Sequence, residues 1–321
     1  MSNEQSILTL LKKASQAYYD GEPILTNEQY DALEAKSEQI IAGRGEIPHT
    51  FRMYSLQKTY DLSNTPFPVT GDTVKTPKLD GAAVSVLYVN GTFTEALTRG
   101  DGIKGRDITE KMSYLVPDTI PIDLPIVQIT GEVVCHKDTE NARNYCSGAL
   151  NQKDIEVFKQ RKTDGKMQFV AYQVQHKTDS VGLTNSYSED LAILSTEWNL
   201  LTVKSINDDI FPLDGYVYRI DDNRDFDAVG YTAKFPRGAF AYKQNAEGVE
   251  TVLLDVIWQT GKTGKVTPVA ILEPVMVGDA QVQRATLNNQ AFIEALDLEL
   301  GCKVKVVRSG EIIPCITERV Y

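Results

Sequence analysis

The stretch KTPKLDG at residues 75–81 puts two lysines beside an Asp-Gly pair, ahead of an apolar run. A lysine amine acts as a nucleophile when it is neutral and held against its target. Lys75 and Lys78 are both candidates, and composition does not choose between them. The ordinary alternative for either residue is a solvated lysine at the start of a strand.

Other charged side chains interrupt apolar strands. Arg99 precedes the glycines of RGDG, and Glu132 interrupts PIVQITGEVVC. Arg219 and Lys243 lie within LDGYVYRI and AFAYK. Each alone is typical of a solvated side chain. Together, several basic groups and one acid in apolar strands indicate a site for a polyanion and its metal, because phosphoryl transfer consists mostly of positioning and charge stabilisation.

Strands and helices without regular alternation must hold these residues, which predicts an α+β fold. Helical spacing over 5–20, and an N-cap at Thr26, predict a small N-terminal helical unit. Asn90-Gly91 predicts a type I′ hairpin that returns Arg99 toward Lys78, placed at the start of a strand. Further strands are predicted at 125–135, 167–174 and 213–221, and helices at 137–160 and 188–200.

From about residue 250 onward the sequence is nearly all β, with one helix-like segment, AFIEALDL, before the last strand pair. About five strands in this arrangement predict a small barrel such as an OB-fold. A β-sandwich is the alternative that the pattern leaves open.

Composition limits the class of protein. The 321 residues carry a net charge of −11, which neither supports nor excludes nucleic-acid binding, because phosphate contacts need only a local basic surface. No apolar run is long enough for a membrane span, and the N-terminus lacks a secretion signal. Four scattered cysteines without a C-x-x-C pair argue against zinc and favour a reducing compartment. We expect a cytosolic protein.

A series of short motifs runs in order through the chain. It comprises HTFRMYSL (49–56), KLDG, LTRGDG, TGE, NARN with SGAL (141–150), FVAY, LDGYVYR, YTAKFPRGAFAYK, WQTGKTGKVTPVAILEPV, QRATLNN and VRSGEIIP. This series resembles the NAD⁺-dependent DNA ligases, a branch of the covalent nucleotidyltransferases whose nucleophile motif is K-x-D-G. The resemblance extends over about residues 15–316.

The resemblance assigns the nucleophile to Lys78 and leaves Lys75 as a flanking lysine. It implies that Lys78 attacks the α-phosphate of NAD⁺, releases nicotinamide mononucleotide and forms lysyl-AMP. The AMP then passes to a 5′-phosphate at a DNA nick, and the 3′-hydroxyl displaces it. The catalytic residues that it implies are Lys78, Asp80, Arg99, Glu132, Arg219 and Lys243, with Asp80 and Glu132 acting on Mg²⁺ through water and the basic residues holding phosphates.

The resemblance also implies binding residues. Those for the nicotinamide mononucleotide half of NAD⁺ are Tyr18, Tyr19, Asn27, Tyr30 and Asp31. Those for the adenylate half are Ser55, Leu56, Gly81 and Tyr172, with Tyr172 stacked on adenine. Those for DNA are Arg143, Lys262, Thr263, Arg308, Ile312 and Ile313, although barrel packing alone would also explain the isoleucines.

The implied domains are a helical nicotinamide-mononucleotide domain (1–48), a nucleotidyltransferase (adenylation) domain (49–247) and an OB-fold domain (248–321). The expected partners are NAD⁺, Mg²⁺ and nicked duplex DNA, with no zinc and no membrane, for a monomer in a bacterial or infected-host cytosol. Bacterial members continue into a zinc module and further DNA-binding modules, so the chain is expected to be either a naturally minimal enzyme or a shortened form of a longer one. In either case we expect it to bind nicks weakly and with strong salt dependence.

Several residues depart from the family pattern. Asn27 replaces Asp, Thr76 replaces Glu, Arg219 replaces Lys, and Asn151 and Lys262 each replace Arg. We interpret them as drift in a divergent branch, with a virus as a candidate source. Two alternatives stay open: a related nucleotidyltransferase that uses ATP or acts on RNA, and a catalytically idle DNA-binding subunit.

Overall fold

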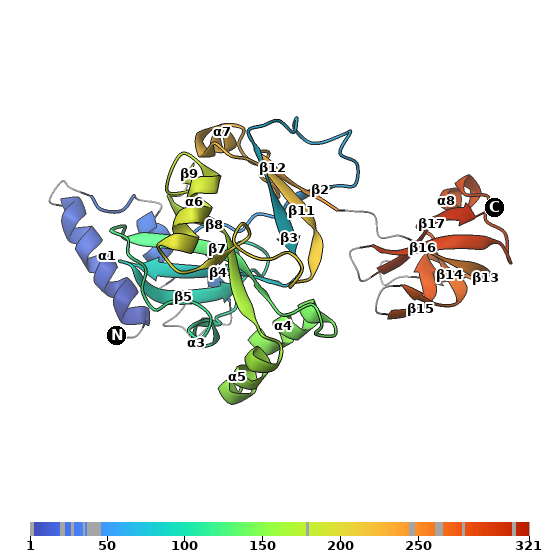
Figure 1. The fold of residues 1–321 in the computed structure, drawn as a ribbon, viewed down its shortest axis with the longest axis horizontal. Helices are drawn as coiled ribbons and strands as arrows, with labels where there is room; N and C mark the ends of the chain where they lie inside the picture. The colour runs from blue at the N-terminus through green and yellow to red at the C-terminus, as the bar shows by residue number, and fades with distance from the viewer. Residues whose placement is uncertain are drawn as a thin grey trace. The chain divides into compact units, whose positions relative to one another are not determined.

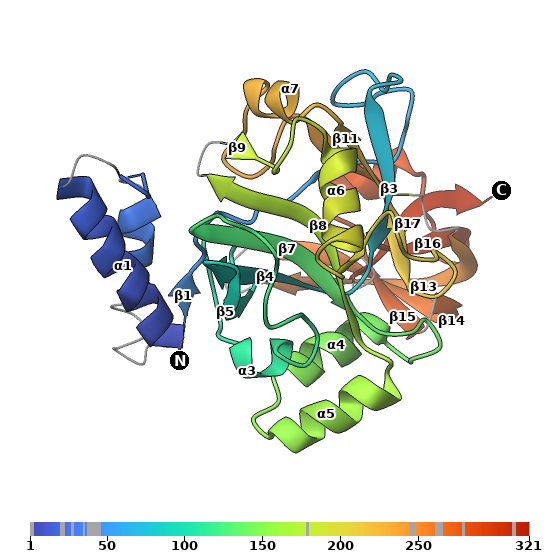
Figure 2. The same cartoon turned by 60° about the vertical axis from the view of Figure 1, so that its left-hand side comes forward.

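The computed structural model divides into two compact units, Met1–Lys243 and Gln244–Tyr321 (Figures 1 and 2). No helix in the parts that it describes is long and apolar enough to cross a membrane. The structure describes residues 3–19, 23–26, 29–34, 36, 46–177, 180–243, 248–260, 266–277, 280–309 and 313–320.

The N-terminal helical unit begins with α1 (Asn3–Tyr19), followed by helical residues at 29–34. The predicted N-cap is confirmed as a reciprocal pair: Gln29 N donates to Thr26 Oγ1 at 3.2 Å, and Thr26 N donates to Gln29 Oε1 at 2.9 Å. Most of the remaining helix predicted after Thr26 lies outside the described residues. The apolar side chains of this unit, including Ile7 and Leu33, pack against strands of the neighbouring sheet.

A six-stranded sheet forms the centre of the first unit, in the order β10-β8-β7-β4-β5 with β9 beside β8. The predicted hairpin joins β4 to β5, and both of its central residues have positive φ (Asn90 48°, Gly91 72°). The strands are β4 (Ala82–Val89), β5 (Thr92–Thr98), β7 (Ile126–Val134), β8 (Gln168–Lys177), β9 (Ser180–Val181) and β10 (Leu201–Thr202).

Helices cover one face of this sheet and enclose the largest apolar core. The helix predicted over 137–160 is two helices, because the chain turns after Leu150 and Asp154 caps a new start by accepting from Glu156 N. The helices on this face are α3 (Thr109–Met112), α4 (Ala142–Leu150), α5 (Ile155–Asp164) and α6 (Tyr187–Thr196).

A four-stranded sheet, in the order β2-β12-β11-β3, completes the first unit together with α7 (Asn223–Ala228). Its strands are β2 (Gln57–Thr59), β3 (Thr73–Leu79), β11 (Leu213–Ile220) and β12 (Ala239–Tyr242), and a separate pair joins β1 (Ile47–Pro48) to β6 (Lys104–Gly105). β3 is an edge strand, which explains how Pro77 is tolerated within it.

The position of Lys78 differs from the prediction. Lys78 is the second-last residue of β3, which pairs with β11, and so does not begin the hairpin strand β4. The chain changes sheets at Asp80-Gly81, where a Cβ on Gly81 would lie 2.3 Å from the Val133 carbonyl oxygen. Only glycine allows that approach, so the apolar run after Lys78 belongs to another sheet.

The second unit is a closed barrel in the order β13-β14-β15-β17-β16, with Leu253, Ala270 and Val304 in its core. Closure confirms the OB-fold prediction over the sandwich alternative. Its elements are β13 (Val249–Thr260), β14 (Val266–Val277), β15 (Ala280–Thr286), α8 (Gln290–Ala295), β16 (Lys303–Ser309) and β17 (Ile313–Val320).

Candidate active site

Two lysines share one carboxylate at the end of the four-stranded sheet. Lys78 Nζ lies 2.7 Å from Asp214 Oδ2, and Lys243 Nζ lies 2.5 Å from Asp214 Oδ1. The exposed fractions of the three side chains are 27% for Lys78, 10% for Asp214 and 11% for Lys243. The cluster is therefore partly desolvated, and Lys78 keeps the most access to solvent.

A β-bulge aims Asp214 at both lysines. Leu213 pairs with Leu79 and Gly215 pairs with Lys78, so Asp214 is an extra residue in β11. Gly215 has a φ of 126°, and a Cβ there would meet the Tyr242 carbonyl oxygen at 2.2 Å. Glycine is thus required at 215 for the bulge to form.

Charge balance keeps Asp214 ionised. Burial disfavours its carboxylate, but the ammonium groups of Lys78 and Lys243 outweigh burial and lower the pKa of Asp214. We did not select Asp214 from the sequence as a site residue. The available signal was an Asp-Gly pair at the start of a predicted strand, the same signal that follows Lys78.

A second group of charges lies where β3 passes into β4. The backbone N–H of Gly81 donates to the Glu132 carboxylate on β7, and Arg143 Nη1 lies 3.4 Å from Asp80 Oδ1. Burial raises the pKa of Glu132 to about 7; Lys78 and Arg143 oppose this rise, whereas the Asp80 carboxylate adds to it. Two carboxylates that repel each other at the edge of a cationic cluster form an arrangement that a divalent cation would stabilise.

Arg99 and Tyr172 lie at the same end of the six-stranded sheet. The Arg99 guanidinium donates to Ser55 Oγ, and its backbone N–H donates to Ala83 O. Tyr172 is an extra residue in β8 opposite the β7 strand that carries Glu132. Burial raises the pKa of Tyr172, and the Glu132 carboxylate adds to this shift. Both therefore lie near Glu132, which pairs with Ala83.

Arg219 lies apart from the lysine cluster. Its guanidinium carbon is 4.2 Å from the ring centre of Tyr187 and 4.0 Å from that of Phe226. Its amino groups donate to the Ile220 carbonyl and to Asn223 Oδ1. It is 6% exposed, and burial lowers its pKa. The described contacts of Arg219 are thus to rings and neutral oxygens. Of the basic groups expected to hold phosphates, Lys243 contacts Asp214, whereas the described contacts of Arg99 and Arg219 are to other residues.

Only part of the expected nicotinamide set is described. Tyr30 is half-buried against the apolar cluster of the helical unit, and Asp31 is exposed. Tyr18 and Tyr19 form the end of α1, but their side chains, and all of Asn27, lie outside the described parts.

The remaining predicted residues likewise divide into those whose side chains are described and those that are described in part or not at all. Leu56 packs beside Phe226 and Ala239, and Arg143 is 53% exposed on α4. In the barrel, Arg308 and Ile313 are described by their backbones in β16 and β17 only. Lys262, Thr263 and Ile312 lie outside the described residues.

Comparison with known proteins supplies the family. A model of the NAD-dependent DNA ligase adenylation domain matches residues 43–209, and one of the NAD-dependent DNA ligase OB-fold domain matches residues 250–321. DNA ligase 1 of Nocardia farcinica is 32% identical over 94% of this chain and 52% of its own length. The DNA ligases of Nautilia profundicola (30% identical) and Aliarcobacter butzleri (31%) are each matched over 98% of this chain and 57% of their own length.

The chain thus spans about half the length of the curated relatives that it matches. The matched ranges include Lys78 and Glu132 as well as the barrel, and Asp214 and Lys243 lie between the two ranges. The chain belongs to the NAD-dependent DNA ligase family.

Proposed function

We propose that this chain is an NAD⁺-dependent DNA ligase that seals nicks in duplex DNA through a lysyl-AMP intermediate. The observation that carries the proposal is the cluster in which Asp214 accepts from both Lys78 and Lys243, at the K-x-D-G motif of a chain of this family. Family membership supplies the reaction class, and the cluster supplies a nucleophile with its proton acceptor.

In the first step Lys78 Nζ forms a bond to the α-phosphorus of NAD⁺, and the bond from that phosphorus to the oxygen of nicotinamide mononucleotide breaks. Asp214 Oδ2, 2.7 Å from Nζ, is the acceptor for the proton that Lys78 must lose. Lys243 remains a cation beside the reacting phosphate and stabilises the charge that develops on its oxygens. Arg99 is the second phosphate ligand.

The Mg²⁺ expected for this chemistry would be held by Asp80 and Glu132, through water. The described residues contain no group of three or more potential ligands, so a cage made of protein side chains alone is not expected there. Two carboxylates with retained waters fit Mg²⁺, which gives up its water reluctantly. The ion would neutralise charge on the phosphates, and it would favour ionised Glu132.

Two groups of residues are proposed to bind the two halves of NAD⁺. Tyr172, in its bulge beside Glu132, stacks on adenine, with Ser55, Leu56 and Gly81 around the adenylate. The helical unit, through Tyr30 and Asp31 and with Tyr18, Tyr19 and Asn27, binds the nicotinamide ribotide. That unit is the reason to favour NAD⁺ over ATP as the adenylate donor.

In the later steps AMP moves to the 5′-phosphate of the nick, and the 3′-hydroxyl displaces it. Arg143, exposed on α4 and 3.4 Å from Asp80, is suited to contact the nick or the AMP. We further propose that the barrel contacts duplex DNA through Lys262, Thr263, Arg308, Ile312 and Ile313. The proposed protein is cytosolic and monomeric, with domains at 1–48, 49–247 and 248–321.

One experiment tests the proposal. The protein is incubated with Mg²⁺ and either NAD⁺ or ATP, and an AMP adduct is located by peptide mass spectrometry. We expect the adduct on Lys78, formed from NAD⁺. An adduct from ATP alone would replace the NAD⁺ assignment, and no adduct from either donor would favour the idle DNA-binding subunit.

Lys75→Ala is the matched control for Lys78→Ala. Both lysines lie on β3, but Lys75 is exposed and its Nζ lies 3.8 Å from the ring centre of Tyr216. Lys78→Ala should lose the adduct and Lys75→Ala should keep it.

Tyr30→Ala tests the donor site separately. It should abolish adenylylation by NAD⁺ and leave the sealing of a pre-adenylylated nick largely intact. Loss of both activities in a folded variant would contradict the role given to the helical unit.

A further inference from the structure

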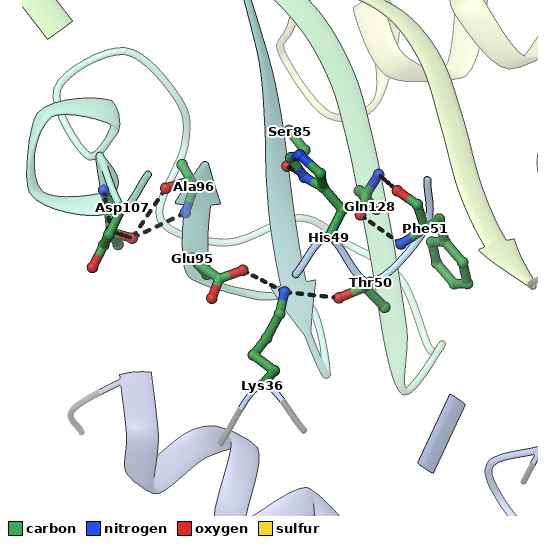
Figure 3. A network of polar contacts seen from close by, with 10 residues as sticks. Lys36, His49, Thr50, Phe51, Ser85, Glu95, Ala96, Asp107 and Gln128 are labelled. Carbon is green, nitrogen blue, oxygen red and sulfur yellow. Dashed lines mark hydrogen bonds and ion pairs between the residues drawn. The ribbon is translucent and has the colours of Figure 1, made fainter. Parts of the chain in front are cut away.

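A buried ion pair joins the N-terminal helical unit to the six-stranded sheet (Figure 3). Lys36 Nζ contacts Glu95 Oε1 on β5 and donates to Thr50 Oγ1 at 3.0 Å. The Lys36 and Glu95 side chains are 1% and 4% exposed. In the described parts of the chain no donor reaches Glu95 Oε2. We call Lys36, Thr50 and Glu95 the latch.

The latch is more than a surface contact, because a buried pair is expensive to form and very sensitive to the loss of one partner. An apolar contact of the same size would hold the helical unit with less positional specificity. A buried charge that meets its partner in only one docked position instead fixes the position of the unit on the sheet. Leu33 from the helical unit and Leu87 from the sheet belong to one buried apolar cluster, and burial of this apolar surface stabilises the packing of the unit on the sheet.

The latch lies on the same face of the six-stranded sheet as Glu132 of the candidate active site. Directly opposed residues on neighbouring strands point to one face, and Glu95 pairs with Leu87, which pairs with Gln128. Four residues along the same strands, Ala83 pairs with Glu132. At about 3.3 Å per residue, the latch is about 13 Å along the sheet from Glu132.

Chain segment 46–56 connects the two sites along that face. Thr50 is part of the latch, and the neighbouring His49 contacts Ser85 Oγ at 2.8 Å and the Arg99 carbonyl at 3.0 Å. Phe51 exchanges two backbone hydrogen bonds with the Gln128 side chain, as Figure 3 shows. Near the end of the segment, Ser55 accepts a hydrogen bond from the Arg99 guanidinium. The segment is therefore hydrogen-bonded at His49, Phe51 and Ser55 to residues of the sheet or of the loop after β5, between the latch and the site.

We propose that Lys36 and Glu95 are positioning residues for the NAD⁺ reaction: the latch fixes the helical segment that carries Tyr30 and Asp31 on the face of the six-stranded sheet that carries Glu132. This inference rests on the proposed function. In this proposal the latch acts in adenylylation by NAD⁺, because that reaction requires the nicotinamide half of NAD⁺ to be held in a fixed position. Sealing of a nick that already carries AMP does not need it.

The central variant is Lys36→Met, which keeps the bulk of the side chain and leaves Glu95 buried without its cation. We expect the KM for NAD⁺ to rise about tenfold or more, and sealing of a pre-adenylylated nick to change by less than about twofold. The double variant Lys36→Met with Glu95→Leu should recover most of the NAD⁺ reaction, because it removes the unpaired charge and keeps the apolar contact.

Charge reversal supplies the specific test. Lys36→Glu alone and Glu95→Lys alone should each lose the NAD⁺ reaction, and the two together should recover part of it. The control is the same reversal at Glu156 and Lys159, an exposed pair on α5, which should change nothing. Thr50→Val is the mild variant for the case in which the single reversals do not fold, and it should raise the KM for NAD⁺ in the same direction.

Hydrogen exchange of the α1 backbone at residues 7–14 reports docking without any activity. Loss of protection together with loss of the NAD⁺ reaction, and with sealing retained, supports the latch. Two results overturn it: an unchanged KM for NAD⁺ in a variant whose α1 has lost protection, or an equal fall of both activities in every variant. If the unmodified protein forms no lysyl-AMP from NAD⁺, the proposed function fails, and exchange then still shows whether the latch docks the unit.

Discussion

Lys78 and Lys36 each pair with a carboxylate inside the same unit, but their surroundings differ. Lys78 shares Asp214 with a second lysine and keeps 27% of its side chain exposed, whereas Lys36 has Glu95 as its one ionic partner among the described residues and is 1% exposed. Burial acts to raise the pKa of both carboxylates. At Asp214 the two ammonium groups outweigh burial and the pKa is lowered, whereas at Glu95 burial outweighs Lys36 and the pKa is raised.

The difference separates a pair suited to chemistry from a pair suited to positioning. A carboxylate shared by two ammonium groups can release one of them without becoming an isolated buried charge, so Lys78 can leave to attack a phosphate. Glu95 has no such second cation, so the loss of Lys36 exposes the full penalty of burying a charge. Four changes test this contrast, from the largest expected effect to the smallest.

Asp214→Asn should have the largest effect, on activity. The amide cannot accept the Lys78 proton and leaves two ammonium groups facing each other, so lysyl-AMP formation should fall by about 100-fold or more. Single-turnover labelling with NAD⁺ measures this rate. Asp208→Asn, in an exposed loop, is the control. A rate within a few-fold of the unmodified protein would show that Asp214 is only structural.

Lys36→Met should have the largest effect on stability, about 3–5 kcal/mol, because it leaves Glu95 buried and unpaired. Denaturant unfolding measures the change in the free energy of unfolding. Lys78→Met should cost much less, since Lys243 still neutralises Asp214. Equal losses in the two variants would remove the contrast between the two pairs.

Gly215→Ala should destabilise the fold by about 2–4 kcal/mol, through positive φ and the clash with Tyr242 O. Gly230→Ala is the matched control, since Gly230 also has positive φ (71°) but has open space where the Cβ would stand. Thermal unfolding of both variants separates the clash from the backbone strain. If the two variants melt alike, the close approach at the bulge is not what requires glycine.

Glu132→Gln should give the smallest effect and one that depends on pH. Its pKa is raised from 4.5 to about 7, so the protonated form stabilises the folded state below about pH 4.5, and this contribution is lost as the pH rises through about 7. Without Mg²⁺, the variant should match the unmodified protein at low pH and be more stable at about pH 8, on the order of 2 kcal/mol. Melting curves across this range measure it; a constant difference would mean that Glu132 does not titrate as described.

Much of the fold followed from local pattern. The Asn90-Gly91 turn, the Thr26 cap and the five-stranded barrel were all predictable, because each depends on a few neighbouring residues or on the spacing of apolar positions. The sequence places Lys78 at the start of the hairpin strand, whereas in the structure Lys78 lies at the end of β3, in the other sheet. Nothing local distinguishes a strand that ends at Lys78 from one that begins there, and the close approach of Gly81 to β7 is a long-range contact.

The candidate site divides in the same way, into residues that local pattern predicts and residues that only long-range contacts identify. Lys78, Glu132, Arg99 and Lys243 could be selected as charges in apolar strands and matched to a motif series. Asp214 could not be selected in this way, because its importance depends on a bulge that turns it toward two lysines from other strands. Lys36 and Glu95 resemble ordinary surface charges in sequence, and only docking of the helical unit buries them.

The sequence by itself determined the family, the nucleophile motif and the kinds of element present, since these are encoded in residue types at short spacing. The tertiary structure alone decided which carboxylate each lysine meets. Lys78 meets Asp214 at 136 positions' separation, and Lys36 meets Glu95 at 59. Such pairings depend on how two sheets and a helical unit pack, because burial, which sets the energy of each charge, arises only when distant segments enclose it.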